Sequence, residues 1–218
     1  MVLKSIFTIL SILFISYASL KSTINSNRKQ LAQAYKIATN KSETFNQIRD
    51  KFTNHLVNEI IPQWYGTKWS FDGYSETPKS GSIACGYFVS TTLRDVGLNL
   101  NRYKLAQKAP YYEAKVIACG TTIETLQNKT KEELKSYFID NKKDGLYFIG
   151  LDFHVGFILK EGKNIYFIHS NYLNNSGPVK EKIDDSKVMN SSVYHFCNLT
   201  HNDILLKKWL NNEVVTTN

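Results

Sequence analysis

Nucleophilic chemistry in this chain would start from Cys85. The residue follows the approach GSIA and begins an apolar-periodic segment that ends at Gly97, which predicts a helix with Cys85 at its N-terminus. Unpaired backbone N–H groups and the positive end of the helix dipole favour a thiolate there, so we expect a lowered thiol pKa. A lone cysteine in an apolar run is more often a small core residue. The functional interpretation therefore needs a partner from elsewhere in the chain.

A predicted hairpin supplies that partner. Residues 146–172 form two aromatic and β-branched runs around Lys160-Glu-Gly-Lys163, which indicates two antiparallel strands. A symmetric turn centred between Glu161 and Gly162 places His154 directly opposite His169, with Cβ atoms about 4.5–5.5 Å apart. Asp152 and Asn171 form the next pair on the same face. Such a polar cluster in an apolar hairpin is difficult to explain as packing.

These residue types match the requirements of cysteine-dependent acyl transfer. The reaction needs a sulfur nucleophile, an imidazole that carries its proton, and a third polar group that orients the imidazole. Cys85, His154 and His169 would fill these roles, and backbone N–H groups at the helix N-terminus would stabilise the oxyanion.

Four short motifs resemble the NlpC-type superfamily of papain-like cysteine peptidases. They read GTKW at 66–69, ACGYFV at 84–89, HVGFI at 154–158 and FIHS at 167–170, and the similarity covers about half of the chain. The resemblance implies Cys85 as nucleophile, His154 as base and His169 as third member. The substrate-binding or oxyanion candidates are Trp69, Tyr87, Asp152 and Asn171. It also implies hydrolysis of amide bonds in peptidoglycan stem peptides, without metal or cofactor.

The chain departs from the family pattern near the nucleophile. Ala84 stands where an aspartate usually precedes the cysteine, and Gly86 replaces a serine. Trp69 replaces a tyrosine that lies near the oxyanion site in relatives, and its indole N–H can donate but cannot accept a hydrogen bond. These departures affect the expected substrate more than the expected nucleophile.

The predicted fold is α+β and papain-like, with helices packed on a small, mainly antiparallel sheet and the nucleophile at a helix N-terminus. We expect a signal peptide at 1–18, cleaved near Ala18, with an uncleaved membrane anchor as the alternative. An N-terminal helical segment follows at 19–63, with a break near Thr39-Asn40-Lys41 and an end at Pro62. The cysteine hydrolase domain covers 64–218, and the whole forms one compact domain.

Composition narrows the partners without naming one. The full chain carries a charge of +8, and removal of 1–18 takes away one lysine and no acid, leaving 26 − 19 = +7. This charge suits an anionic polymer, but the basic residues are spread along the sequence and no nucleic-acid motif accompanies them. The three cysteines match no zinc-site spacing. A disulfide between Cys119 and Cys197 and two free thiols both remain open.

The sequence thus predicts an exported cysteine hydrolase, secreted or periplasmic, with no stable membrane span after cleavage. An acyltransferase or lipid-amide hydrolase would use the same three residues, because thioacyl chemistry does not fix the acceptor. A catalytically degenerate, wall-associated binding domain is the third hypothesis, motivated by the departures around Cys85. The oligomeric state is left open.

Overall fold

The chain folds as an α+β protein with a six-stranded antiparallel sheet. The structure, a computed structural model, describes residues 16–217. The strands are β1 (Glu124–Gln127), β2 (Gly145–Gly150), β3 (Val155–Glu161), β4 (Asn164–Asn171), β5 (Gly177–Lys182) and β6 (Val193–Asn198). The helices are α1 (Tyr17–Ile37), α2 (Lys41–Asn54), α3 (Ile61–Gln63), α4 (Cys85–Asp95), α5 (Arg102–Ala106), α6 (Pro110–Ala118), α7 (Lys131–Asn141) and α8 (Asp203–Asn211).

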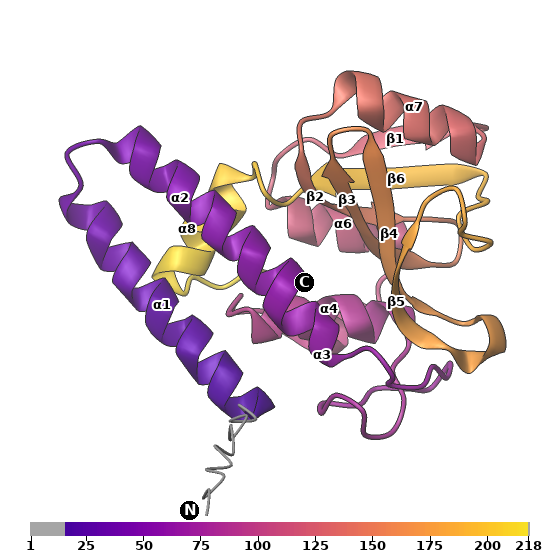
Figure 1. The fold of residues 1–218 in the computed structure, drawn as a ribbon, viewed down its shortest axis with the longest axis horizontal. Helices are drawn as coiled ribbons and strands as arrows, with labels where there is room; N and C mark the ends of the chain where they lie inside the picture. Colours follow the sequence, from indigo (N-terminus) through magenta and orange to yellow (C-terminus); the bar gives the residue numbers. More distant parts are fainter. Residues whose placement is uncertain (1–15, 218) are drawn as a thin grey trace, which may run out of the picture.

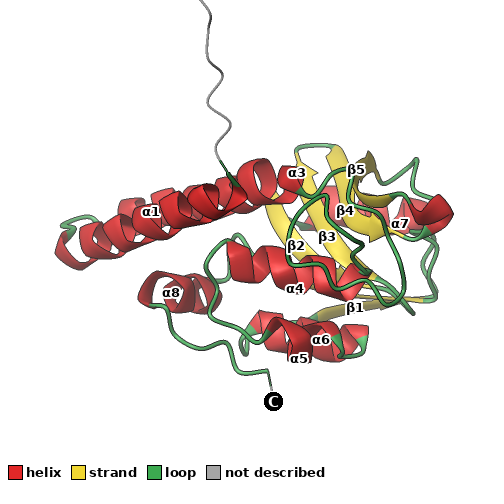
Figure 2. Ribbon diagram, turned by 90° about the horizontal axis from the view of Figure 1, so that it is seen from below, coloured by secondary structure: helices red, strands yellow, loops and turns green. Residues whose placement is uncertain are grey.

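Helices cover both faces of the sheet, whose strand order is β1-β6-β2-β3-β4-β5 (Figures 1 and 2). One face, with Phe148 and Phe157, packs against α1, α2, α4, α6 and α8 in the larger buried cluster. The other face, with Tyr147 and Phe167, packs against Leu134 and other residues of α7. The alternation of apolar side chains along each strand supplies both faces, which explains why the central strands are almost fully buried.

The N-terminal arm is an antiparallel helix pair that lies to one side of the sheet in Figure 1. The predicted break is confirmed: α1 ends at Ile37 and α2 begins at Lys41 with Asn40 as its N-cap. The predicted end at Pro62 is wrong. A π-helical turn, His55–Ile60, joins α2 to α3, and Pro62 occupies the first turn of α3, where a missing N–H costs nothing.

The predicted signal segment overlaps the folded chain. Residues 1–15 lie outside the described part, whereas Ser16 caps α1 and Tyr17 begins it. The Tyr17 hydroxyl donates to Asp95 Oδ2 at 2.7 Å and accepts from Trp64 Nε1 at 3.0 Å. Within residues 16–217, no helix combines the length and apolarity that a bilayer crossing requires.

Strong local signals in the sequence explain several element boundaries. Gly97 follows the end of α4 with a φ of 106°, a conformation that favours glycine. Pro110 begins α6, and Thr130 forms a capping box with Glu133 at the start of α7. Strand β1 is short, and residues 183–188 form a series of turns and bends.

The hairpin exists, but its predicted register is wrong. β3 and β4 pair Glu161 with Asn164, so the turn is centred one residue later than expected, at Gly162 and Lys163. Gly162 has a φ of 59°, and a glycine takes this conformation without strain, which explains the shift. The displacement changes every partner by two residues, an even number. His154 and His169 therefore stay on the same face but are diagonal neighbours rather than directly opposite.

Candidate functional site

Cys85 is the first residue of α4, as predicted, and the loop at 64–80 braces the chain that leads into it. The Ala84 N–H donates to the Gly73 carbonyl at 2.8 Å, and the Ile83 N–H donates to the Lys68 carbonyl at 2.9 Å. From the sheet, Ser170 Oγ donates to the Ile83 carbonyl at 2.7 Å. The loop and strand β4 thus fix the backbone immediately before the sulfur.

Gly86 has a packing reason that the sequence did not show. A Cβ atom at this position would lie 2.5 Å from the Ala106 carbonyl oxygen, at the end of α5. The end of α5 therefore packs directly against the first turn of α4. A serine, the residue usual in the resembling family, does not fit there without displacing α5.

The electrostatic environment of Cys85 contradicts the predicted lowering of its pKa. Burial, together with the neighbouring Glu113 carboxyl, raises the thiol pKa. The N–H groups of Val155, Gly86 and Cys85 face the sulfur and lower the pKa, but burial outweighs them. The resting residue is therefore a neutral thiol, held against the peptide that joins His154 to Val155.

The two histidines come together as predicted. His154 Nε2 and His169 Nδ1 are 2.8 Å apart, and both side chains are buried. The Phe167 ring stacks on His169 with centroids 4.0 Å apart, which fixes the plane of that imidazole. Burial lowers the pKa of both rings, most strongly that of His154, so both are neutral at rest.

Gly156 makes the diagonal contact between the histidines feasible. Extending the β3–β4 register places Gly156 opposite His169, and a Cβ on Gly156 would lie 2.9 Å from the His169 Cβ. A side chain there would push His169 away. The open position instead lets the His154 ring reach across from the residue before β3.

Glu181 extends the pair to a chain of three side chains. Its Oε1 lies 3.1 Å from His169 Nε2, and this contact lowers the carboxyl pKa. Sequence reasoning missed Glu181. The alternation along β5 was the available signal: Glu181 pairs with Phe167, on the face that also carries His169.

The three side chains determine which nitrogens carry protons. An ionised carboxylate only accepts, so His169 Nε2 carries a hydrogen and its Nδ1 is an acceptor. His154 Nε2 must then donate to that Nδ1. The remaining lone pair of the neutral ring is on His154 Nδ1, which has no hydrogen-bond partner among the described residues. Glu181 thus prepares His154 as a base.

Trp69 lies in an aromatic row that leads to His154. Its ring centroid is 6.1 Å from that of Tyr172, and the Tyr172 ring is 5.4 Å from that of His154. The backbone N–H of Trp69 donates to the Asn175 carbonyl, and this hydrogen bond ties the loop to the turn before β5. The indole Nε1 is buried and has no acceptor among the described residues. A buried N–H without a partner is uncommon and is available to a bound acceptor.

The other three predicted binding residues lie in separate surroundings. Tyr87 packs between Tyr74 and Tyr103 and receives a hydrogen bond from Gln107 Nε2 at 3.3 Å. The Asp152 carboxylate accepts from the Ser192 N–H and hydroxyl, both at 2.7 Å. Asn171 accepts from the Leu173 N–H. The predicted pairing of Asp152 with Asn171 is therefore wrong.

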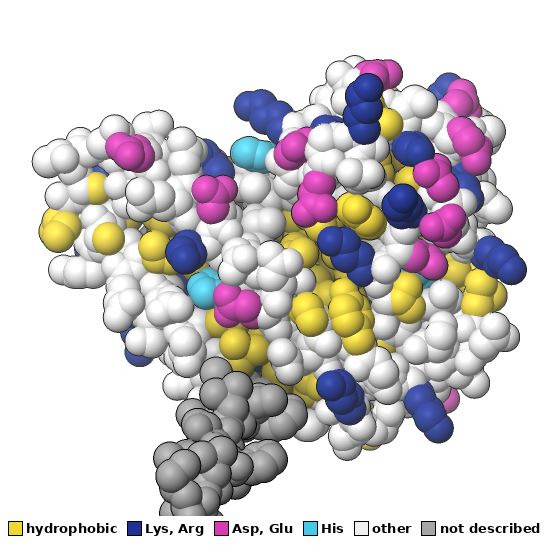
Figure 3. All heavy atoms as spheres, viewed as in Figure 1, with side chains coloured by type: hydrophobic (Ala, Val, Ile, Leu, Met, Phe, Trp, Pro, Cys, Tyr) yellow, Lys and Arg dark blue, Asp and Glu magenta, His cyan; other side chains and the backbone are white. Residues whose placement is uncertain are grey.

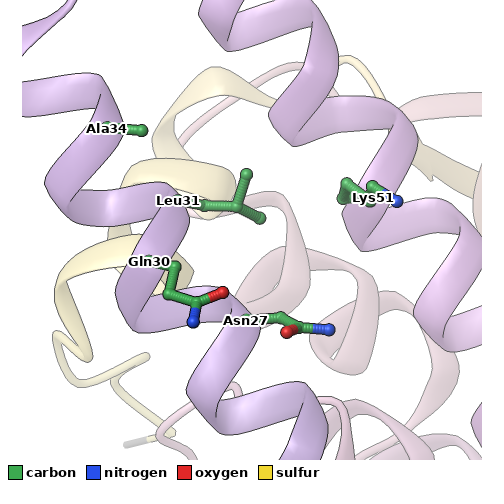
Figure 4. Close-up of a pocket in the computed structure, with 5 residues that line it drawn as sticks. All are labelled: Asn27, Gln30, Leu31, Ala34 and Lys51. Carbon is green, nitrogen blue, oxygen red and sulfur yellow. The ribbon is translucent and has the colours of Figure 1, made fainter.

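The described residues form a cavity away from the predicted site and no cluster of metal ligands. A cavity of 340 Å³ lies between α1 and α2, and its lining, shown in Figure 4, contains none of the predicted site residues. Among residues 16–217, no group of three or more His, Cys, Asp and Glu side chains is arranged to hold a metal ion. All three cysteines are free.

Comparisons with protein-family models, with curated proteins and with solved structures found no match for this chain.

Proposed function

We propose that the chain is a papain-like cysteine hydrolase that cleaves amide bonds, with Cys85, His154 and His169 as its catalytic residues. The observation that carries the proposal is the hydrogen-bonded series His154–His169–Glu181, together with the backbone N–H of Val155, the residue after His154, which faces the Cys85 sulfur. Burial of two polar imidazole rings costs folding free energy, and packing alone does not account for them. A catalytic role would explain why the chain keeps them there.

The reaction would begin with a neutral site. As a substrate carbonyl approaches, the Cys85 proton moves to His154 Nδ1 and the sulfur forms a bond to the carbonyl carbon. The imidazolium that results is stabilised through His169 by the Glu181 carboxylate. His154 then gives the proton to the leaving amine as the C–N bond breaks, and water hydrolyses the thioester by the same proton route.

The oxyanion would meet two kinds of donor. The backbone N–H groups of Cys85 and Gly86 face the sulfur at the start of α4. The Trp69 indole N–H would be the third donor, because it is buried and has no acceptor within residues 16–217. Donors that are fixed before the charge develops give the largest rate effect in acyl transfer.

Peptidoglycan stem peptides are the proposed substrate, on the basis of the resemblance to NlpC-type peptidases and of the apolar N-terminal run that suggests export. Exposed aromatic side chains around the site would support a large substrate. Phe153, next to His154, is 97% exposed, and Phe71, in the loop that braces Ala84, is 82% exposed. Exposed aromatic residues of this size at a catalytic site suggest contact with a partner.

The direct test is incubation of the purified chain with peptidoglycan of several wall types, followed by assay of newly released amino groups. The Cys85→Ala variant is the matched control. We expect release by the wild-type chain only. Failure on every wall type would remove the peptidoglycan substrate from the proposal.

An acyltransferase or lipid-amide hydrolase is the second candidate, and the same exposed Phe71 and Phe153 favour it because they suit an acyl chain. Activated ester probes followed by intact-mass measurement would trap the acyl group on Cys85. An adduct in the absence of wall cleavage would favour this second function. No adduct on Cys85 would contradict both enzymes and favour the non-catalytic binding domain.

A further inference from the structure

Three lysines from two separate segments of the chain line one cavity. Lys108 precedes α6, Lys115 lies within α6, and Lys208 lies on α8. They line a cavity of 500 Å³ together with Tyr112, Val116, Cys119 and Thr216. The even spread of basic residues along the sequence therefore does not hold in three dimensions.

The three lysines line a cavity that has no acidic residue among its lining residues, unlike the mixed charges around α7. Around α7, on the face shown in Figure 3, basic and acidic side chains are intermixed. Two ion pairs there are Lys135 with Asp184 and Lys142 with Glu124. In the described chain, none of the ion pairs includes Lys108, Lys115 or Lys208, and the cavity lining contains no acidic residue.

The cavity walls are held in place by contacts outside the cavity. The C-terminal tail is fixed where the Val215 N–H donates to the Asn99 carbonyl at 2.8 Å. Lys208 Nζ donates to the Val214 carbonyl at 3.0 Å, which directs its ammonium along the tail. Helix α6 is packed against the sheet through buried residues such as Ile117. Lysine side chains from two helical regions therefore line one cavity whose walls the fold holds in place.

We propose that this cavity binds a compact anionic group, a phosphate ester attached to a residue of about the size of a sugar. Three ammonium groups provide donors for phosphate oxygens, and Tyr112 and Val116 provide contact for the carbon part. The volume falls in the range of small-molecule sites. A nucleic acid would need a groove with stacking aromatic residues along it, and a bilayer would need a protruding apolar surface.

Cys119 provides a probe inside the cavity. The thiol is half-buried; burial raises its pKa, and the Lys208 charge lowers it. A bound anion would shield the sulfur and cancel the effect of Lys208, so both changes slow alkylation. Cys197 is buried and Cys85 lies at the candidate catalytic site, so these two thiols serve as references in the same chain.

The test measures iodoacetamide alkylation of each cysteine in the full chain by peptide mass mapping. Glucose 6-phosphate is the ligand probe, glucose is the neutral control, and potassium chloride matches the ionic strength. We expect glucose 6-phosphate to slow alkylation of Cys119 severalfold and to leave Cys85 unchanged. A glycerol phosphate oligomer, compared at equal phosphate concentration, distinguishes a polymer-borne phosphate from a free sugar phosphate.

Two triple variants decide whether the lysines are responsible. K108Q/K115Q/K208Q removes the proposed donors, and K29Q/K163Q/K187Q removes the same charge from exposed positions elsewhere. The first should abolish protection, with about a tenfold loss of affinity for each lysine, and the second should retain it. Equal effects of both variants, or equal protection by potassium chloride, would overturn the proposal. Stronger, lysine-dependent protection by phosphatidylglycerol vesicles or a DNA oligonucleotide would also overturn it.

Discussion

The strand-borne and helix-borne halves of the candidate site differ in how complete they are without substrate. On the strands, His154, His169 and Glu181 are joined by contacts of 2.8 and 3.1 Å, so the base is already oriented. At the helix, the Cys85 sulfur makes no hydrogen bond to a His154 ring nitrogen within residues 16–217, and the Trp69 indole has no acceptor. The fold thus orients the base in advance, whereas the Trp69 indole N–H remains available to bind a substrate.

The largest expected effect comes from removing the base itself. His154→Gln keeps an amide N–H that can donate to His169 Nδ1 but supplies no group that accepts the Cys85 proton. We expect a loss in kcat/KM of at least about 10³-fold on the substrate identified by the wall assay. Thermal unfolding of the variant should stay close to that of the wild-type chain. Activity above a tenth of wild type would show that the strand-borne half is not the base.

The next largest effect tests Trp69, which lies in the loop before α4. Trp69→Phe keeps the aromatic row but removes the unpaired N–H, so kcat should fall about 10²-fold with little change in KM. Tyr172→Phe is the matched control, since it keeps its ring next to His154. A Trp69→Phe variant with unchanged kcat would exclude the indole as an oxyanion donor.

A smaller effect is expected at Glu181. Glu181→Gln can still accept from His169 but loses the negative charge that stabilises the imidazolium, so kcat should fall about tenfold. Because that charge raises the pKa of His169, its loss should move the acid limb of the pH–rate profile to lower pH. Glu161→Gln, at the exposed end of β3, is the control. A shift to higher pH, or no shift, would contradict the positioning role.

The smallest effect is a displacement along the pH axis. Burial raises the Cys85 thiol pKa, so the midpoint of its alkylation rate against pH should lie above the ordinary value of about 8.5. His154→Gln should leave the midpoint unchanged, because the ring is neutral. A midpoint well below 8.5 that rises in the variant would instead indicate a thiolate–imidazolium pair at rest.

How much of the site the sequence predicts depends on the kind of signal. Local periodicity predicts both Cys85 at a helix start and the two histidines on one face of a hairpin. The histidine prediction survives the wrong register because a shift of two residues keeps each side chain on the same face. Glu181 and Asp152 are different. Their partners are decided by strand β5 and by the chain near Ser192, and a single hairpin gives no information about what pairs beside it.

The same limit applies to residues whose role is set by a distant backbone. Gly86 is a departure from a family pattern in the sequence, and only the position of Ala106 gives it a cause. The Cys85 pKa was misjudged for a related reason. A helix N-terminus is visible in the sequence, but the depth at which the sulfur is buried is a property of the assembled layers.

The contact of Tyr17 with Trp64 and Asp95 means that any cleavage after Ala18 would reduce stability. A peptidase that cut after Ala18 would remove the hydroxyl, leaving the fully buried Trp64 indole without an acceptor and Asp95 with one donor fewer. An unsatisfied buried donor costs about 1–3 kcal/mol. We therefore expect a lower free energy of unfolding for the shortened chain than for the chain that keeps this tyrosine.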